Sequence, residues 1–208
     1  NMDDIETMKI IGDIFLKLGR FPEAIDIYNR LVEYEPNNQS FYYNIASSFY
    51  QLNDLDNALD YFLKVIELNE EDYNVYIDIG IILNKKNLFS EAESYLIKAL
   101  DCGFTNKNLL MQLGISYGGQ KKFLQSLIAF QNALKFSLED PILHYQIGIV
   151  YKELSIFDLA IKNLNFYLEN NKNDEVTLML IGECHLNLKE YDNAITIFEK
   201  TYRINKNY

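Results

Sequence analysis

Residues 39–72 read QSFYYNIASSFYQLNDLDNALDYFLKVIELNEED, and this stretch decides the fold. Its first part carries apolar side chains at helical steps of three, one and three residues: Tyr42, Ile45, Ala46 and Phe49. After a polar Asn-Asp pair, a second set follows with similar spacing: Leu55, Ala58, Leu59, Phe62 and Val65. Such spacing places the apolar side chains on one face of an α-helix. The stretch therefore predicts two antiparallel amphipathic helices, A and B, joined by a short turn.

The same arrangement recurs every 34 residues along the chain. Glycines keep this step or twice this step at Gly12, Gly80, Gly114, Gly148 and Gly182. A second row holds Ala24, Ala58, Ala92, Ser126, Ala160 and Ala194. Because a chance pattern does not keep its phase over six periods, we infer six repeats without insertions, at 5–38, 39–72, 73–106, 107–140, 141–174 and 175–208. Positions within a repeat are counted below from its first residue.

The repeats are expected to form one all-α domain over residues 5–208. A single unit of 34 residues is too small to build its own core, so neighbouring repeats must stack into a solenoid. The small residues at positions 8 and 20 let helices A and B approach closely, and the large residue at position 24 fills the space between repeats. Residues 1–4 are interpreted as an N-terminal extension, with Asn1 ahead of Met2 as a remnant of an expression tag.

This pattern resembles the tetratricopeptide repeat (TPR) family. Its residues are Met8, Ile11-Gly12, Phe15, Ala24, Tyr28 and Pro36 in the first repeat, and Tyr76, Ile79-Gly80, Leu83, Ala92 and Leu96 in the third. The resemblance implies a right-handed α–α superhelix of helix-turn-helix repeats, with the A helices lining a concave groove. It also implies a non-catalytic scaffold that binds a peptide or helical segment of a partner protein in that groove.

In this family, positions 5, 6 and 9 of the A helices face the groove. The residues expected to bind a peptide there are Tyr43, Asn44, Ile77, Asp78, Ile81, Met111, Gln112, Ile115, Tyr145, Gln146 and Ile149. The apolar members would contact apolar side chains, while the amides can donate to and accept from a peptide backbone. In the alternative, a tightly wound solenoid buries part of this surface against its own repeats.

Charge narrows the class of partner. The net charge is −11, and residues 1–104 carry all of it, with 8 basic and 19 acidic side chains. An acidic surface disfavours nucleic acids and anionic lipids and would attract a basic protein partner. The alternative is a solvated outer face that keeps the protein soluble. A clamp for a terminal carboxylate, known in some proteins of the family, is disfavoured because Asp13 and Asp78 stand where an amide and a cation are required.

Catalysis, cofactors and metals have no anchor in the sequence. His144 and His185 are expected in the core, and Cys102 and Cys184 lie in different repeats without a C-x2-C motif. Phosphate-binding and nucleophile motifs are absent from the sequence. We therefore expect no catalytic residue, no cofactor and no metal ion. The chain has neither an apolar run long enough for membrane insertion nor a signal peptide, so a cytoplasmic location is expected.

Two alternatives for the function stay open. The last repeat would leave an apolar face of Tyr191, Ile195 and Phe198 uncovered, which predicts self-association into a structural scaffold through the C-terminal repeat. Alternatively, the chain is the substrate-recruiting part of a larger enzyme, as TPR arrays are in some protein glycosyltransferases. The sequence does not identify the partner.

Overall fold

The computed structural model describes residues 2–70 and 72–206. Within these residues it contains twelve α-helices and no strand, which confirms the prediction of an all-α helical repeat fold. Their bounds are α1 Met2–Lys17, α2 Phe21–Tyr34, α3 Gln39–Gln51, α4 Leu55–Leu68, α5 Tyr73–Lys85, α6 Phe89–Asp101, α7 Lys107–Gly119, α8 Phe123–Leu134, α9 Pro141–Glu153, α10 Phe157–Asn170, α11 Glu175–Asn187 and α12 Tyr191–Lys206.

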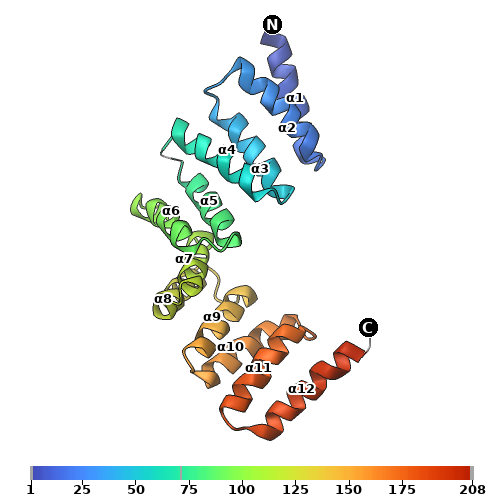
Figure 1. Ribbon diagram of the computed structural model, residues 1–208, viewed down its shortest axis with the longest axis vertical. Coiled ribbons are helices and arrows are strands. Elements are labelled where there is room, and N and C mark those ends of the chain that lie inside the picture. Colours follow the sequence, from blue (N-terminus) through green and yellow to red (C-terminus); the bar gives the residue numbers. More distant parts are fainter. Residues whose placement is uncertain (1, 71, 207–208) are drawn as a thin grey trace. The chain divides into compact units, whose positions relative to one another are not determined.

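The helices follow one another as A–B pairs (Figure 1). Each odd-numbered helix packs against the next even-numbered one, and within each half of the chain a B helix also packs against the following A helix. The chain divides into two compact units, Asn1–Phe104 and Thr105–Tyr208, which we describe separately. A single domain of six repeats stays a prediction.

Polar caps explain where the A helices begin. The last residue of the preceding repeat accepts a hydrogen bond from a backbone N–H of the first turn at α3, α7, α9 and α11; these caps are Asn38, Asn106, Asp140 and Asp174. Such a cap satisfies an otherwise unpaired donor and is worth about 1 kcal/mol. Asp72 occupies the same position before α5, but its carboxylate accepts a hydrogen bond from Nε2 of Gln39 at 2.7 Å instead.

Turns of one conformation join each A helix to its B helix. The residue at position 15 has a positive φ in every repeat, between 59° and 69°: Gly19, Asn53, Asn87, Lys121, Ser155 and Lys189. This left-handed conformation reverses the chain within three residues. Only Gly and, to a lesser extent, Asn adopt it without appreciable strain, so Lys and Ser are held there by the packing of the two helices.

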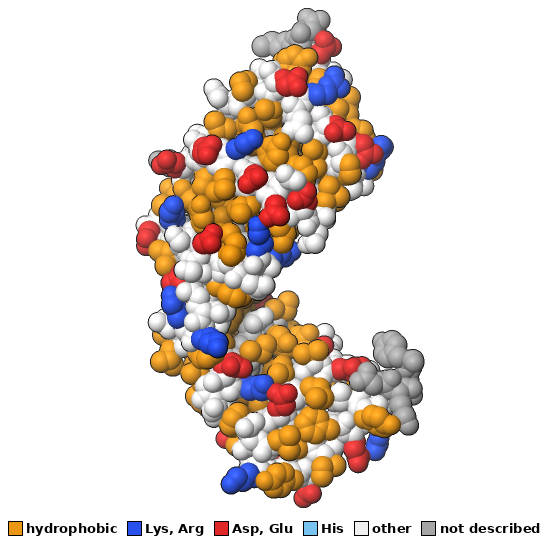
Figure 2. All heavy atoms as spheres, viewed as in Figure 1, with side chains coloured by type: hydrophobic (Ala, Val, Ile, Leu, Met, Phe, Trp, Pro, Cys, Tyr) orange, Lys and Arg blue, Asp and Glu red, His pale blue; other side chains and the backbone are white. Residues whose placement is uncertain are grey.

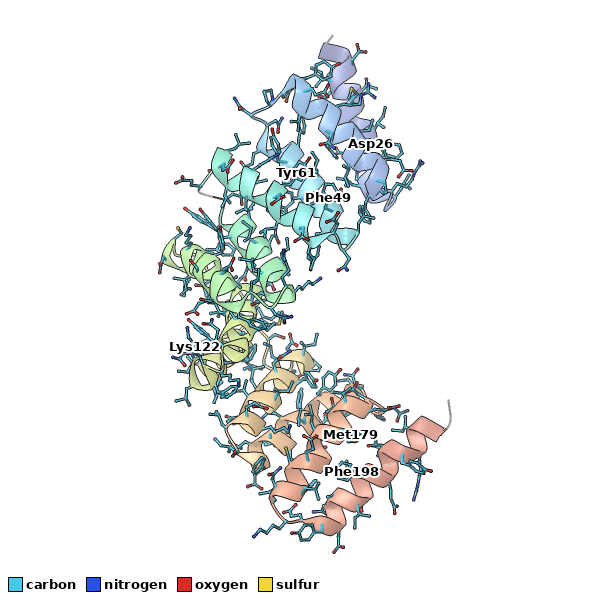
Figure 3. All side chains as sticks on the ribbon, in the orientation of Figure 1. Asp26, Phe49, Tyr61, Lys122, Met179 and Phe198 are labelled. Atoms are coloured by element: carbon cyan, nitrogen blue, oxygen red, sulfur yellow. The ribbon has the colours of Figure 1, made fainter. Side chains whose placement is uncertain are left out.

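The glycines at position 8 allow the close approach of helices A and B, as the sequence predicted. A Cβ atom on Gly182 would lie 2.4 Å from Cε1 of Phe198, which Figure 3 labels on α12. A Cβ on Gly80 would likewise lie 2.5 Å from Cδ2 of Leu96. The large residues at position 24 thus fill the space between helices A and B of their own repeat, and not only the space between repeats.

Each unit has its own apolar core. In the first unit a buried cluster centres on Tyr28, Leu31 and Ile45, with Phe49 and Tyr61 packed at its edge in stacked rings 5.6 Å apart (Figure 3). The second unit has one cluster around Phe130 and Ile147 and another around Leu164, Leu168, Leu178 and Ile181. No helix in the described part of the chain has the length and apolar character that crossing a lipid bilayer requires.

Candidate functional site

In the first unit, α3 and α5 bring several of the expected groove residues together. Tyr43, Asp78 and Ile81 line one hollow of about 150 Å³. The hydroxyl of Tyr43 donates a hydrogen bond to Oδ2 of Asp78 at 3.2 Å, which ties the two A helices together. The three remaining side chains from α3 and the one from α4 that complete the lining are Ser47, Tyr50, Gln51 and Phe62.

Sequence reasoning placed none of these four side chains in the site. Ser47, Tyr50 and Gln51 occupy positions 9, 12 and 13, which face the groove in this family, so the repeat numbering could have identified them. Phe62 belongs to a B helix and carried no such signal. It is 3% exposed, and its ring meets that of Tyr43 edge-on at 5.5 Å and 72°, so that it forms the floor of the hollow.

Asp78 has an unusual electrostatic environment. Burial, opposed by the Tyr43 hydrogen bond and reinforced by the negative charge of Asp72, raises the pKa of its carboxyl from 3.8 to about 6. Burial and the Asp78 charge raise the pKa of the Tyr43 hydroxyl to about 12, so that this hydroxyl remains a donor at neutral pH. Within the part of the chain that the structure describes, no Lys or Arg forms an ion pair with Asp78.

Asn44 is already engaged inside the first unit. The hydroxyl of Tyr28 donates to Oδ1 of Asp13 at 2.5 Å, and the Asn44 amide hydrogen-bonds to the same hydroxyl. Burial and the neighbouring Asp13 raise the pKa of Tyr28. Asn44 is half-buried, so only part of its amide can face a peptide.

Two of the expected binding residues are buried. Ile77 is 3% exposed and Gln112 is 8% exposed, so both have little surface to offer a partner. The reason is that buried residues surround most of α5 and much of α7, whereas the sequence pattern predicted an open face at these positions. For these two residues the structure agrees with the alternative of a partly self-buried groove.

The second unit holds its expected residues at the edge of its core. Met111 and Ile115 of α7 are half-buried and pack against the cluster around Phe130. Tyr145 of α9 packs against the cluster around Leu164, with its ring 4.9 Å from that of Tyr167. Gln146 and Ile149 are half-buried on the same helix. These side chains therefore keep part of their surface while contributing to the fold.

The residues considered for chemistry are engaged in the fold. Both ring nitrogens of His144 have partners, Oδ1 of Asn163 at 2.9 Å and the carbonyl of Leu138 at 3.1 Å, and His185 contacts Glu190 at 2.6 Å. Both histidines are half-buried and do not lie in the core as expected. Among the described residues, no group of three or more His, Cys, Asp or Glu side chains is placed to hold a metal ion.

The last helix exposes part of the apolar face that the sequence predicted. Tyr191 and Ile195 are 59% and 56% exposed, and Tyr202 is 61% exposed. Phe198, expected on that face, packs over Gly182 instead. The surface view in Figure 2 shows Asp and Glu side chains spread over α1–α4 among hydrophobic patches, as the charge of residues 1–104 requires.

Comparison with known proteins agrees with the repeat architecture. Two models of the tetratricopeptide repeat family match the chain, one over residues 11–73 and the other over residues 177–208. Among curated protein sequences, none matches this chain.

Several solved structures share the fold. YrrB, described as a TPR protein with an unusual peptide-binding site, is 21% identical, with 85% of this chain and 91% of YrrB covered and a TM-score of 0.71. MamA from Desulfovibrio magneticus is 19% identical over 83% of this chain and 97% of its own, with a TM-score of 0.77. PilF from Pseudomonas aeruginosa is 15% identical over 97% and 92%, with a TM-score of 0.78. At these identities the likeness shows the fold alone.

Proposed function

Because the chain belongs to the tetratricopeptide repeat family, we propose that it is a non-catalytic scaffold that binds a peptide or helical segment of a partner protein along its A helices. The fold is that of protein–protein interaction scaffolds, and YrrB is described as having a peptide-binding site. The observation that carries the proposal is the hollow between α3 and α5, where Tyr43, Asp78 and Ile81 converge. Ile81 would contribute apolar contact, and Asn44 would contact the peptide backbone.

In the second unit, Met111, Ile115, Tyr145 and Ile149 would offer apolar contact and Gln146 a backbone contact. Complete burial of such an apolar side chain is worth about 1.5–3 kcal/mol. Because these side chains are already half-buried, each has only part of that energy left for a partner. Micromolar affinity requires about 8 kcal/mol, so polar contacts must supply a substantial share of the affinity.

The experiment compares three baits in affinity capture from a lysate of the source cells. The first bait is the wild-type chain, the second carries Ile81→Lys and Ile115→Lys, and the control carries Leu52→Lys and Ile128→Lys. The control residues are 45% and 58% exposed and lie outside the proposed binding residues. Circular dichroism checks that all three baits keep their helices.

We expect the wild type and the control to retain the same protein and the Ile81/Ile115 variant to lose it. Retention by all three baits would place the interface elsewhere on the chain. If the Ile81/Ile115 variant loses helicity, these side chains serve the core, and the proposal fails for them.

A second candidate function is self-association, favoured by the exposed stripe of Tyr191, Ile195 and Tyr202 on α12. These residues are spaced by four and seven positions, which places them on one helix face. Sedimentation velocity at high protein concentration tests the idea. A concentration-dependent oligomer that Ile195→Lys abolishes would support it, and a monomer at every concentration would refute it.

A further inference from the structure

The hollow of the first unit has a lining that combines aromatic rings with one carboxylate. Tyr43, Tyr50 and Phe62 supply three rings, and Asp78 supplies the carboxylate. The volume of about 150 Å³ corresponds to roughly five water molecules, which suits one side chain and not a whole helix. The hollow is therefore a pocket for a single residue of a bound segment.

The carboxylate in this hollow lacks a compensating positive charge. Asp78 is half-buried, and its hydrogen-bond donor is the neutral Tyr43 hydroxyl. The neighbouring Asp72 adds further negative potential. A partly buried carboxylate without a cation is unfavourable, so a positively charged group that enters the hollow relieves this cost.

The aromatic rings favour the same kind of ligand. The face of a Tyr ring attracts an ammonium or guanidinium group within about 6 Å of the ring centre. One such contact already exists at the hollow, because Nζ of Lys85 lies 4.2 Å from the centre of the Tyr50 ring. Lys85 is the resident cation that a ligand would meet, and its charge lies over Tyr50 and not in an ion pair with Asp78.

We propose that this hollow selects a Lys or Arg side chain of the bound segment, with Asp78 as its counter-ion and Tyr43 and Tyr50 around its aliphatic stem. The inference rests on the proposed function, because it names the chemistry of one residue in the captured segment. The net charge of −11 on residues 1–104 would attract a basic segment over a longer range. A Glu or Asp side chain would be repelled, and an apolar one would leave Asp78 buried without a counter-ion.

The test uses three short peptides titrated into the isotope-labelled full chain by NMR. The probes are acetyl-Gly-Ala-Lys-Ala-Gly-amide and the same peptide with norleucine or Glu in place of Lys. The signals followed are those of the Tyr43 and Tyr50 rings and the Ile81 methyl groups. The protein variants are Asp78→Asn, which keeps an acceptor for Tyr43, and Asp60→Asn, which removes one exposed acid of α4 and matches the net charge.

We expect the Lys peptide to shift these signals saturably, with an affinity at least about tenfold higher than that of the norleucine peptide. Asp78→Asn should abolish this difference, and Asp60→Asn should preserve it. Equal affinity for Lys and norleucine, an unchanged Lys affinity in Asp78→Asn, or no shift at the hollow would each overturn the inference. The proposed function fails separately, through the Ile81/Ile115 capture experiment, because a groove can retain its partner without any preference for a basic residue.

Discussion

The hydroxyl of Tyr43 donates a hydrogen bond to Oδ2 of Asp78, 3.2 Å away and 35 residues later in the chain. Tyr43 stands at position 5 of the second repeat and Asp78 at position 6 of the third, so this contact links adjacent repeats on their A helices. It also places a carboxylate beside aromatic rings in the largest expected cluster of binding residues in the first unit. The stability of the protein and its choice of ligand therefore meet at Asp78.

Replacing Asp78 with Asn should change how stability depends on pH. The pKa of Asp78 is raised from 3.8 to about 6 in the folded protein, so the folded state binds this proton more tightly than the unfolded state. The wild type therefore loses stability as the pH rises from about 4 to about 6. Asp78→Asn lacks this loss and should be more stable than the wild type at pH 7 by about 1–2 kcal/mol, a figure reduced for partial solvent access.

Urea unfolding at pH 4, 5, 6 and 7 checks this prediction. The difference between the variant and the wild type should be near zero at pH 4 and reach its full size by pH 7. Asp60→Asn is the control and should show no such trend, because Asp60 is exposed. A difference for Asp78→Asn that stays constant across the range would contradict the electrostatic explanation.

Gly80→Ala should destabilise the first unit. The new Cβ would lie 2.5 Å from Cδ2 and 2.6 Å from Cγ of Leu96, so helix α5 or α6 must shift. We expect a loss of about 1–2 kcal/mol, since overpacking outweighs the gain of about 1 kcal/mol in helix propensity. Thermal unfolding measures it. Gly118→Ala is the matched change, because its Cβ meets only Oγ of Ser126 at 3.3 Å, and it should be close to neutral.

The left-handed turns give a prediction of opposite sign. Lys189 has φ of 62°, and Lys189→Gly should raise the free energy of unfolding by about 0.5–1 kcal/mol, because glycine removes the strain at a smaller entropic cost. Gly19→Ala should lower it by about 1 kcal/mol, since its Cβ would meet nothing within 4 Å and only φ of 69° opposes it. Chemical denaturation of both variants decides the matter; a destabilised Lys189→Gly would show that the Lys side chain contributes more than its strain.

The two thiols should react at very different rates. Cys184 is fully buried in α11, and burial raises the pKa of its thiol to about 11, so that very little thiolate is accessible at neutral pH. Cys102 is exposed. A coloured thiol reagent should label about one thiol per chain in the native state and the second only in urea. Native labelling of Cys102→Ser at the wild-type rate would show that α11 opens readily.

The period of the sequence determined the helical architecture. Position 8 must be small because position 24 of the same repeat lies over it, as Gly182 and Phe198 show. Position 34 must be polar because it caps the next A helix, as Asn38 and Asp174 do. Both requirements are local, between residues that are close in the sequence, so they recur every 34 residues and can be found without a structure.

Tertiary structure decided which of the expected binding residues keep a surface. Ile77 and Tyr43 share position 5, yet Ile77 is 3% exposed while Tyr43 lines the hollow. The repeat pattern assigns both to the same face, but burial depends on how the neighbouring helices pack around each one. The same holds for Phe62, whose place on the floor of the hollow depends on the Tyr43 ring above it, and for Asp78, whose raised pKa comes from burial and from a charge in another part of the repeat array. These properties arise from side chains that are distant in the sequence, and only the folded chain brings them together.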